Sequence, residues 1–308
     1  MSRQDQKKVL ITGGSGFIGQ RSIRDLAPRY EIVATFHDAA LGALNIESVP
    51  WEAERGSGVD LVERTSPEAI VHLLALTSAE RCSEDPGKAT RINVEFTREL
   101  AEAALQRRIP FVFTSTDQVF DGRGGNYAED HPVSASPGVY ARTKIETERI
   151  LEGIFEGNEP LLTIFRIALS YGWSSDDHVG PVGWIIRDVE QGKSVNLFHD
   201  EFRSPVFVGD IARAVGEAID HEVSGLFHLA GPDQIDRHSM GLALADKFGL
   251  DPELIQRRSV EDYAGCEPRL RDVSMRTDHF AATFGWAPCG LEEGLNRMAK
   301  EQEDNRNE

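Results

Sequence analysis

The sequence predicts an α/β protein with a Rossmann-type, doubly wound parallel sheet and a smaller, mostly helical domain. Short apolar, β-branched runs alternate with helical patterns over roughly the first 115 residues. Such alternation is typical of a parallel sheet covered by helices on both faces. A glycine-rich turn follows the first run, at Gly13 to Gly19. The composition, with 40% hydrophobic and 27% charged residues, is that of an ordinary globular chain.

The individual elements follow from periodicity and from flanking glycine and proline. Because apolar runs of four to eight residues favour buried strands, we expect strands at 9–12, 31–36, 69–75, 111–114 and 161–169. Helices are expected at 17–27, in a separate stretch that ends near residue 65, at 93–107 and at 139–151. The alternation weakens after Tyr171, where 174–183 suggests a loop. A helix at 206–219 and a strand at 225–230 return to the sheet, and elements after Gln234 are shorter and helical.

This alternation predicts two domains built from discontinuous segments. Residues 1–170 together with 205–231 form the expected dinucleotide-binding Rossmann domain. Residues 171–204 together with 232–300 form the expected substrate-binding domain. The composition of 301–308 predicts a flexible tail.

The formal net charge of -18 makes binding of nucleic acid or of an anionic membrane unfavourable. Solubility and adaptation to high salt both agree with this charge. The three cysteines are widely spaced and form no CxxC pair, so the sequence signals neither a disulfide framework nor a metal site. No apolar run approaches a membrane span, and no signal-peptide pattern precedes the first strand, so we expect a cytoplasmic protein.

The glycine-rich turn lies between the first expected strand and the first expected helix. Its three glycines, Gly13, Gly16 and Gly19, permit a tight turn, close approach of a pyrophosphate, and close packing of helix on sheet. The amino terminus of the helix offers free N–H groups and the positive end of its dipole to phosphates. Because the pattern has the required strand–turn–helix context, it predicts a dinucleotide site that also includes Ser15, Phe17 and Ile18.

The end of the second expected strand bears on the choice of cofactor. An acidic residue usually stands there to bind the ribose hydroxyls of NAD, whereas this chain has Phe36, with Asp38 two positions later. The missing acid removes a repulsion against a 2′-phosphate, which His37 is placed to contact. We therefore expect NADP(H), with NAD(H) as the alternative.

Tyr140 and Lys144 form a YxxxK pattern at the start of a helix. Residues four apart share one helix face, so we expect the ammonium to lower the pKa of the phenol from about 10. Such a tyrosine is a general acid for a ketone oxygen, and the lysine also holds the nicotinamide ribose. The pattern is common by chance, but Thr116 or Ser115 at the end of the strand at 111–114 adds a hydroxyl that orients a carbonyl.

With these residues in order, the chain resembles an extended short-chain dehydrogenase/reductase, and most resembles the dTDP-4-dehydrorhamnose reductase (RmlD-like) subfamily. The resemblance rests on Thr12 to Gly19, Thr116 and the Tyr140/Lys144 pair, and further on the segments at 72–77, 115–122, 127–130, 203–206 and 269–274.

The resemblance implies NAD(P)H-dependent reduction of a 4-keto group on a nucleotide-linked 6-deoxysugar, by an enzyme that could form a homodimer. It assigns general acid catalysis to Tyr140, ribose binding to Lys144 and carbonyl orientation to Thr116. It adds Leu74 and Ala75 to the cofactor site and Asp117 and Gln118 to the substrate site. Related reductases often have tyrosine at the position of Gln118 and an Asn-Phe pair within the loop at 180–184, so the sugar stays open.

In an acidic chain a substrate diphosphate needs a local positive site. Arg203 and Arg271 stand in loop-like stretches that the resemblance places on the substrate side, so we expect them to bind it. The alternative for each arginine is an ion pair with a surface carboxylate.

Other functions share this fold. A 4,6-dehydratase needs a carboxylate base where this chain has Gln118, so that reaction is disfavoured. A nucleotide-sugar 4-epimerase stays open, although Phe36 argues mildly against it. A non-catalytic, NADP-binding regulatory subunit, like that of methionine adenosyltransferase, is the alternative outside catalysis.

Overall fold

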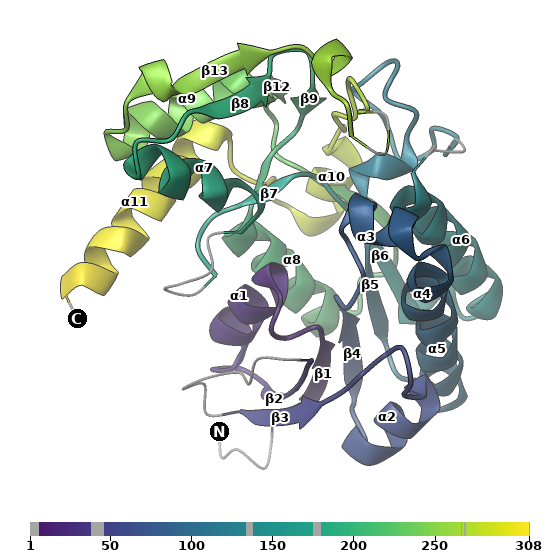
Figure 1. Ribbon diagram of the computed structural model, residues 1–308. Coiled ribbons are helices and arrows are strands. Elements are labelled where there is room, and N and C mark those ends of the chain that lie inside the picture. Colours follow the sequence, from purple (N-terminus) through teal and green to yellow (C-terminus); the bar gives the residue numbers. More distant parts are fainter. Residues whose placement is uncertain are drawn as a thin grey trace.

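The architecture was analysed in a computed structural model (Figure 1). It describes residues 6–37, 46–133, 138–174, 180–265, 267 and 269–307.

A seven-stranded parallel sheet forms the centre of the larger part of the molecule. Its strands are β1 (Lys8–Thr12), β2 (Glu31–Phe36), β3 (Glu47–Pro50), β4 (Ala69–His72), β5 (Phe111–Thr116), β6 (Leu162–Ile167) and β11 (Gly225–Leu229). They are arranged in the order β11-β6-β5-β4-β1-β2-β3, with every neighbouring pair parallel. The order reverses between β1 and β4, and ligands bind at such a point, beyond the carboxyl ends of the strands. The predicted fold class is confirmed.

Helices cover both faces of this sheet, because side chains alternate along each strand. Val9 and Ile11 belong to one buried cluster, whereas Leu10 between them belongs to another. The first face is covered by α1 (Phe17–Leu26) and α8 (Val208–Asp220), and the second by α2 (Gly58–Thr65), α5 (Phe96–Gln106) and α6 (Val139–Ile154) (Figure 1).

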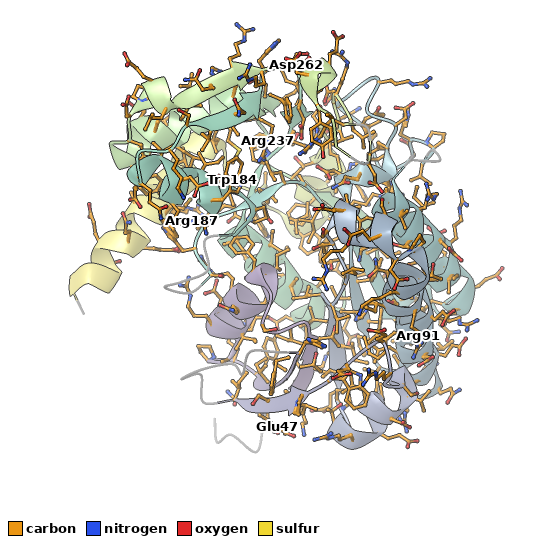
Figure 2. All side chains as sticks on the ribbon, in the orientation of Figure 1. Glu47, Arg91, Trp184, Arg187, Arg237 and Asp262 are labelled. Carbon is orange, nitrogen blue, oxygen red and sulfur yellow. The ribbon has the colours of Figure 1, made fainter. Side chains whose placement is uncertain are left out.

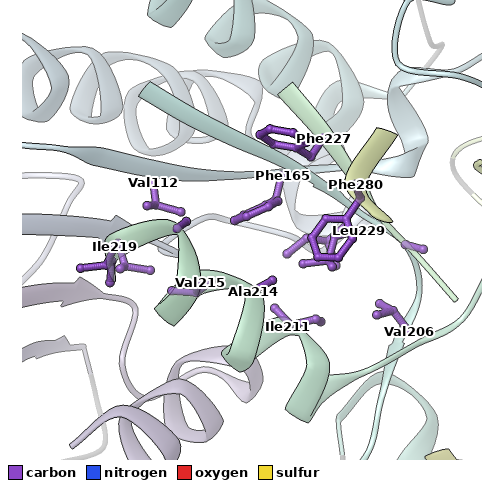
Figure 3. Close-up of a cluster of buried hydrophobic side chains, with 14 of the residues drawn as sticks. Val112, Phe165, Val206, Ile211, Ala214, Val215, Ile219, Phe227, Leu229 and Phe280 are labelled. Carbon is purple, nitrogen blue, oxygen red and sulfur yellow. The ribbon is translucent and has the colours of Figure 1, made fainter. Parts of the chain in front are cut away.

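Figure 3 shows the cluster on the first face. Ile211 and Val215 of α8 belong to this cluster together with Val112 and Phe165 of the sheet. Phe280 belongs to the same cluster, although it comes from α10 (Asp278–Phe284), within the stretch expected for the second domain. The chain therefore returns to the Rossmann sheet late in the sequence.

The predicted element boundaries differ from the structure at three informative places. The strand expected at 69–75 ends at His72. The helix expected at 93–107 begins as a π-helical turn, η2 (Arg91–Glu95), after α3 (Ala79–Glu84) and α4 (Pro86–Thr90). The loop expected at 174–183 gives way to α7 (Gly180–Glu190) from Gly180, with 175–179 outside the described residues.

The remaining elements pack around a separate apolar cluster that includes Val182, Leu197, Leu244 and Leu295. They are α7, β7 (Ser170–Tyr171), β8 (Val195–Phe198), β9 (Phe202–Arg203), β10 (Val206–Phe207), β12 (Ile235–Asp236), α9 (Arg237–Phe248), β13 (Ile255–Arg258) and α11 (Leu291–Asn307). Short 3-10 turns η3 (Asp117–Val119), η4 (Glu159–Leu161), η5 (Pro252–Leu254) and η6 (Val260–Asp262) complete the fold. Strands β12 and β13 show that the region after Gln234 is not purely helical. The division into two domains stays a prediction.

The expected tail at 301–308 is instead helical as far as Asn307, within α11. Glu301 pairs with Arg21 of α1, whose Nη2 lies 2.9 Å from the carboxylate, and Arg21 is largely buried. Composition alone predicts fraying, but this ion pair with a distant helix gives the polar segment a partner.

Candidate active site

A cavity of about 610 Å³ lies at the carboxyl ends of the central strands. Nearly all of the predicted site residues line it: Gly13, Ser15, Gly16, Phe17, Ile18, Gly19, His37, Leu74, Ala75, Thr116, Asp117, Gln118, Tyr140, Lys144 and Arg203. Arg271 is the exception among the predicted residues. The structure thus brings together residues from five strand ends and two helices that are far apart in sequence.

The glycine turn at one side of the cavity leaves no space for side chains. Gly13 has a φ of +71°, and a Cβ there would lie 2.9 Å from the Leu74 backbone. A Cβ on Gly19 would lie 2.3 Å from the carbonyl oxygen of Gly13. These contacts require glycine, as expected for a turn that seats α1 closely on the sheet.

The amino terminus of α1 fits a dinucleotide pyrophosphate. Gly16 is its N-cap residue, which provides no side-chain cap, and no acidic residue stands in the first turn. The first amides of the helix therefore have no local side-chain acceptor, and the positive end of the dipole is not neutralised there. Anions bind at such helix ends.

The end of β2 presents Phe36, half-buried, and the exposed His37 to the cavity. No carboxylate from this strand end lines the cavity within the described residues. Asp38, the acid considered from the sequence, lies outside the described residues.

Tyr140, on the first turn of α6, is buried at the other side of the cavity, which Thr116 also lines. Burial, with the nearby charge of Asp117, raises the pKa of Tyr140 above its ordinary value. We expected Lys144 to lower this pKa. That expectation is wrong for the protein without cofactor, because desolvation outweighs the favourable contacts of the phenolate. The phenol is therefore protonated at neutral pH.

The side chain of Lys144 points toward β5. Its Nζ donates a hydrogen bond of 2.7 Å to the carbonyl oxygen of Thr114 and lies 4.4 Å from the centre of the Phe113 ring. Burial lowers the pKa of Lys144 to about 7, against the opposing charge of Glu148. The ammonium has a carbonyl and a ring as neighbours instead of a carboxylate in contact, so its charge is poorly compensated.

Two buried oxygen atoms of the strand end lack hydrogen-bond partners among the described residues: Ser115 Oγ and Asp117 Oδ2. The other carboxylate oxygen of Asp117 accepts a hydrogen bond of 3.1 Å from Thr116. Burial raises the pKa of Asp117, partly offset by Arg203. Unsatisfied buried polar atoms are costly, so these two oxygens are candidates for contact with ligand hydroxyls.

The two predicted arginines differ in their surroundings. Arg203 is buried, donates 2.9 Å to Glu201 Oε1, and lies 3.9 Å from Asp117 Oδ2. The side chain of Arg271 is half-exposed and pairs with Asp200 at 3.3 Å and with Glu261 at 2.7 Å. The structure does not bring Arg271 to the cavity, because these two surface carboxylates hold its guanidinium.

Arg237 and Asn93, which the sequence did not predict, do not line the cavity, but they interact with residues of the site or next to it. Arg237, labelled in Figure 2, lies at the start of α9, and no ion-pair partner is found for it among the described residues. Burial lowers its pKa to about 10, although Glu201 and Asp117 oppose the shift. An arginine that is partly buried and has no contact ion pair among the described residues is a candidate for binding an anion. Arg237 carries no local motif that would have revealed it.

Asn93 lies in the π-helical turn and is buried. Its Nδ2 donates to the carbonyl oxygen of Leu76 and to Thr143 Oγ1, both at 3.0 Å. Leu76 N donates back to Asn93 Oδ1 at 2.8 Å. Asn93 therefore fixes the loop after β4 to the helix that carries Tyr140. π-helical turns often occur at functional sites, but the sequence showed only an ordinary helical pattern there.

The described residues form neither a metal site nor a membrane-spanning helix. In the part of the chain that the structure describes, no group of three or more His, Cys, Asp or Glu side chains is arranged to hold a metal ion. None of the described helices has the length and apolar character that a membrane crossing requires.

A parallel Rossmann sheet with a glycine turn, a buried tyrosine and a lysine at one cavity defines an NAD(P)-dependent oxidoreductase. The chain belongs to the family of the RmlD substrate-binding domain, whose model matches residues 7–303. The resemblance expected from the sequence is confirmed.

Three relatives illustrate the family. The "Probable low-salt glycan biosynthesis reductase Agl14" of Haloferax volcanii is 27% identical, over 93% of this chain and 95% of that protein. The dTDP-4-dehydrorhamnose reductase of Aggregatibacter actinomycetemcomitans is 26% identical, over 94% and 98%. The methionine adenosyltransferase 2 subunit beta of Xenopus laevis is 25% identical, over 85% and 78%.

Solved structures share the fold. The dTDP-4-dehydrorhamnose reductase of Bacillus anthracis, in complex with NADP, has a TM-score of 0.82 at 20% identity, over 96% of this chain and 99% of that one. The dTDP-glucose 4,6-dehydratase DesIV of Streptomyces venezuelae, with NAD and TYD bound, has a TM-score of 0.80 at 21% identity, over 97% and 98%.

The buried lysine yields a prediction about stability. The pKa of Lys144 is about 7 in the folded protein and about 10.4 in an unfolded chain. Between these values the unfolded chain binds more protons, so stability rises with pH in this window. We expect Lys144→Met to raise the thermal midpoint of the cofactor-free protein by several degrees at pH 6, with a gain that shrinks toward pH 10. Calorimetry across this range measures it, and a gain independent of pH contradicts the assignment.

Proposed function

We propose that the protein is an NAD(P)H-dependent reductase that acts on the 4-keto group of a nucleotide-linked 6-deoxysugar. The observation that carries the proposal is that Tyr140 and Thr116 line one cavity together with the glycine turn and Lys144. Membership of the RmlD family and the relatives named as reductases support the choice of substrate class.

The residues of the cavity suit this reduction. A bound nicotinamide dinucleotide supplies the hydride. Tyr140, protonated because burial raises its pKa, holds the proton that the ketone oxygen must gain. An alkoxide is a much stronger base than a phenolate, so the phenol can give up this proton despite its raised pKa. The Thr116 hydroxyl, which donates to Asp117 in this structure, would turn toward the same oxygen and so orient the carbonyl.

The remaining predicted residues take roles in binding. The glycine turn and α1 would hold the pyrophosphate of the cofactor, with Leu74 and Ala75 beside it, and Lys144 would hold the nicotinamide ribose. Asp117 and Gln118, which line the cavity, would contact the substrate. Because an amide at position 118 cannot serve as a carboxylate base, the arrangement favours reduction over dehydration.

We assign the substrate diphosphate to Arg203 and Arg237. Together with Arg269 they carry three positive charges, against the carboxylates of Glu201 and Asp117 in the same cluster. Arg269 lies 3.5 Å from Glu201 Oε1. This excess of positive charge gives a diphosphate a local attraction within a strongly acidic protein.

A regulatory, non-catalytic role is the second candidate, since the beta subunits of methionine adenosyltransferase 2 are relatives of comparable identity. The two roles make opposite predictions for turnover, because only the reductase depends on the proton of Tyr140. A 4-epimerase would interconvert sugars without net consumption of NADPH.

The first prediction from the proposed function concerns the cofactor. We expect NADPH to bind more tightly than NADH, because Phe36 stands where an acid usually does, and no carboxylate among the described residues of this strand end lines the cavity to repel a 2′-phosphate. Phe36→Asp should shift the preference toward NADH. Titration monitored by nicotinamide fluorescence measures both, with the thermal midpoint as a control for folding. A clear preference of the wild-type protein for NADH contradicts this prediction.

The second prediction tests the reaction itself. A screen of NADPH oxidation against nucleotide-linked 4-keto-6-deoxysugars should identify a substrate for the wild-type protein. Tyr140→Phe should lower kcat by about 100-fold or more, since a general acid contributes roughly 10² to 10⁴, and should leave NADPH affinity nearly unchanged. Failure of the whole panel, combined with capture of a partner subunit, would favour the regulatory role.

The third prediction tests the arginines. Arg203→Ala and Arg237→Ala should each raise KM for the nucleotide-linked substrate by roughly 10-fold or more, because a hydrogen bond to a charged group contributes about 1.5–3 kcal/mol. The effect on kcat should be much smaller. Arg271→Ala is the matched control, since Arg271 pairs with Asp200 and Glu261. An effect of Arg271→Ala as large as that of the other two would place the diphosphate elsewhere.

A further inference from the structure

The helix that carries Tyr140 does not cap its own amino terminus. Gly138 is the N-cap residue of α6, without a side-chain cap, and no acidic residue stands in the first turn. The first amides of any helix have no acceptor within the helix. An acceptor from elsewhere in the chain is therefore needed to fix this end, one residue before Tyr140.

Glu267 supplies this acceptor from 128 residues away. Val139 N donates to Glu267 Oε1 at 2.9 Å, and Ser83 Oγ of α3 donates to the same oxygen at 2.5 Å. A Cβ on Gly138 would lie 2.5 Å from Glu267 Oε2, so the carboxylate lies directly against the helix end. A carboxylate in this place also interacts favourably with the positive end of the helix dipole.

The same stretch of chain reaches the arginine cluster. Arg269, two residues after Glu267, lies 3.5 Å from Glu201 Oε1. The carbonyl oxygen of Leu270 accepts a hydrogen bond of 3.1 Å from Arg203 Nη1. This stretch therefore contacts the helix of Tyr140 through Glu267. It also contacts Arg203, which is assigned to the substrate diphosphate, through the carbonyl oxygen of Leu270.

We propose that Glu267 is a positioning residue that holds the Tyr140 end of α6 against α3 and links it to the arginine cluster of Arg203, Arg237 and Arg269. It acts on the reaction through Val139 N and the helix, not through contact with reacting atoms. Its consequence for turnover rests on the proposed function, whereas its role as a cap does not. An error in the position of a catalytic group costs up to about 100-fold in rate.

Two substitutions separate the hydrogen-bond acceptor from the charge. Glu267→Gln keeps an oxygen that accepts from Val139 N and Ser83 Oγ, whereas Glu267→Ala removes it. Glu261→Ala is the control, because it deletes a carboxylate six positions earlier that pairs with the half-exposed Arg271. All variants are first compared with the wild-type protein by thermal midpoint, to confirm that they fold.

Hydrogen exchange and kinetics then test the proposal on the full chain. In Glu267→Ala, amide exchange in the first turn of α6 should rise at least 10-fold, and kcat should fall roughly 10-fold with KM changed less than about two-fold. Glu267→Gln and Glu261→Ala should stay within about three-fold of the wild-type protein in both measurements.

Each of the other outcomes contradicts one part of the proposal. Unchanged exchange in Glu267→Ala overturns the cap, whatever the activity. Raised exchange with unchanged kcat overturns the positioning role, and an equal loss of kcat in Glu267→Gln and Glu267→Ala shows that charge, not the held helix end, matters. If the wild-type protein reduces no sugar of the panel, the proposed function fails, while the exchange measurement still decides whether Glu267 caps α6.

Discussion

A buried chain of hydrogen bonds runs from the end of β1, next to the glycine turn, to the helix that carries Tyr140. The position of the glycine turn relative to Tyr140 depends on this chain. Thr12 Oγ1, at the end of β1, lies 2.7 Å from His72 Nδ1, and His72 Nε2 lies 2.8 Å from Thr97 Oγ1 of α5. Thr97 donates to the carbonyl oxygen of Asn93, and Asn93 donates to Thr143 on the helix of Tyr140. Burial lowers the pKa of His72 to about 3, so its ring is neutral and accepts one hydrogen bond while donating another.

The site gathers positive side chains although the chain as a whole is strongly negative. The chain carries a formal charge of -18, yet its site collects Lys144, Arg203 and Arg237, which are buried or partly buried. The buried carboxylates Asp117 and Glu201 compensate them in part, and each keeps one oxygen without a hydrogen-bond partner among the described residues. Such an arrangement is costly while it faces only protein, and an anionic, hydroxyl-rich ligand is the kind of molecule that would complete it.

The sequence predicted what local patterns encode. The sheet, the glycine turn and the order of Thr116, Tyr140 and Lys144 follow from apolar runs, from glycines that no other residue can replace, and from spacing along one helix. It did not predict Arg237, Asn93 or Glu267, because their roles come from contacts between segments far apart in the chain. It misplaced Arg271 for the same reason, since a loop sequence does not reveal that Asp200 and Glu261 hold the guanidinium.

The pKa of Tyr140 shows why spacing alone is an incomplete guide to chemistry. A lysine four residues along a helix lowers the pKa of a phenol only if its charge reaches the phenol more strongly than burial and a nearby carboxylate oppose it. Here Lys144 donates to the carbonyl oxygen of Thr114, while Tyr140 is buried near Asp117. The protein therefore holds a protonated phenol and a lysine with a pKa of about 7. Burial and the neighbouring groups, more than the spacing of the two residues along the helix, decide the protonation of this pair.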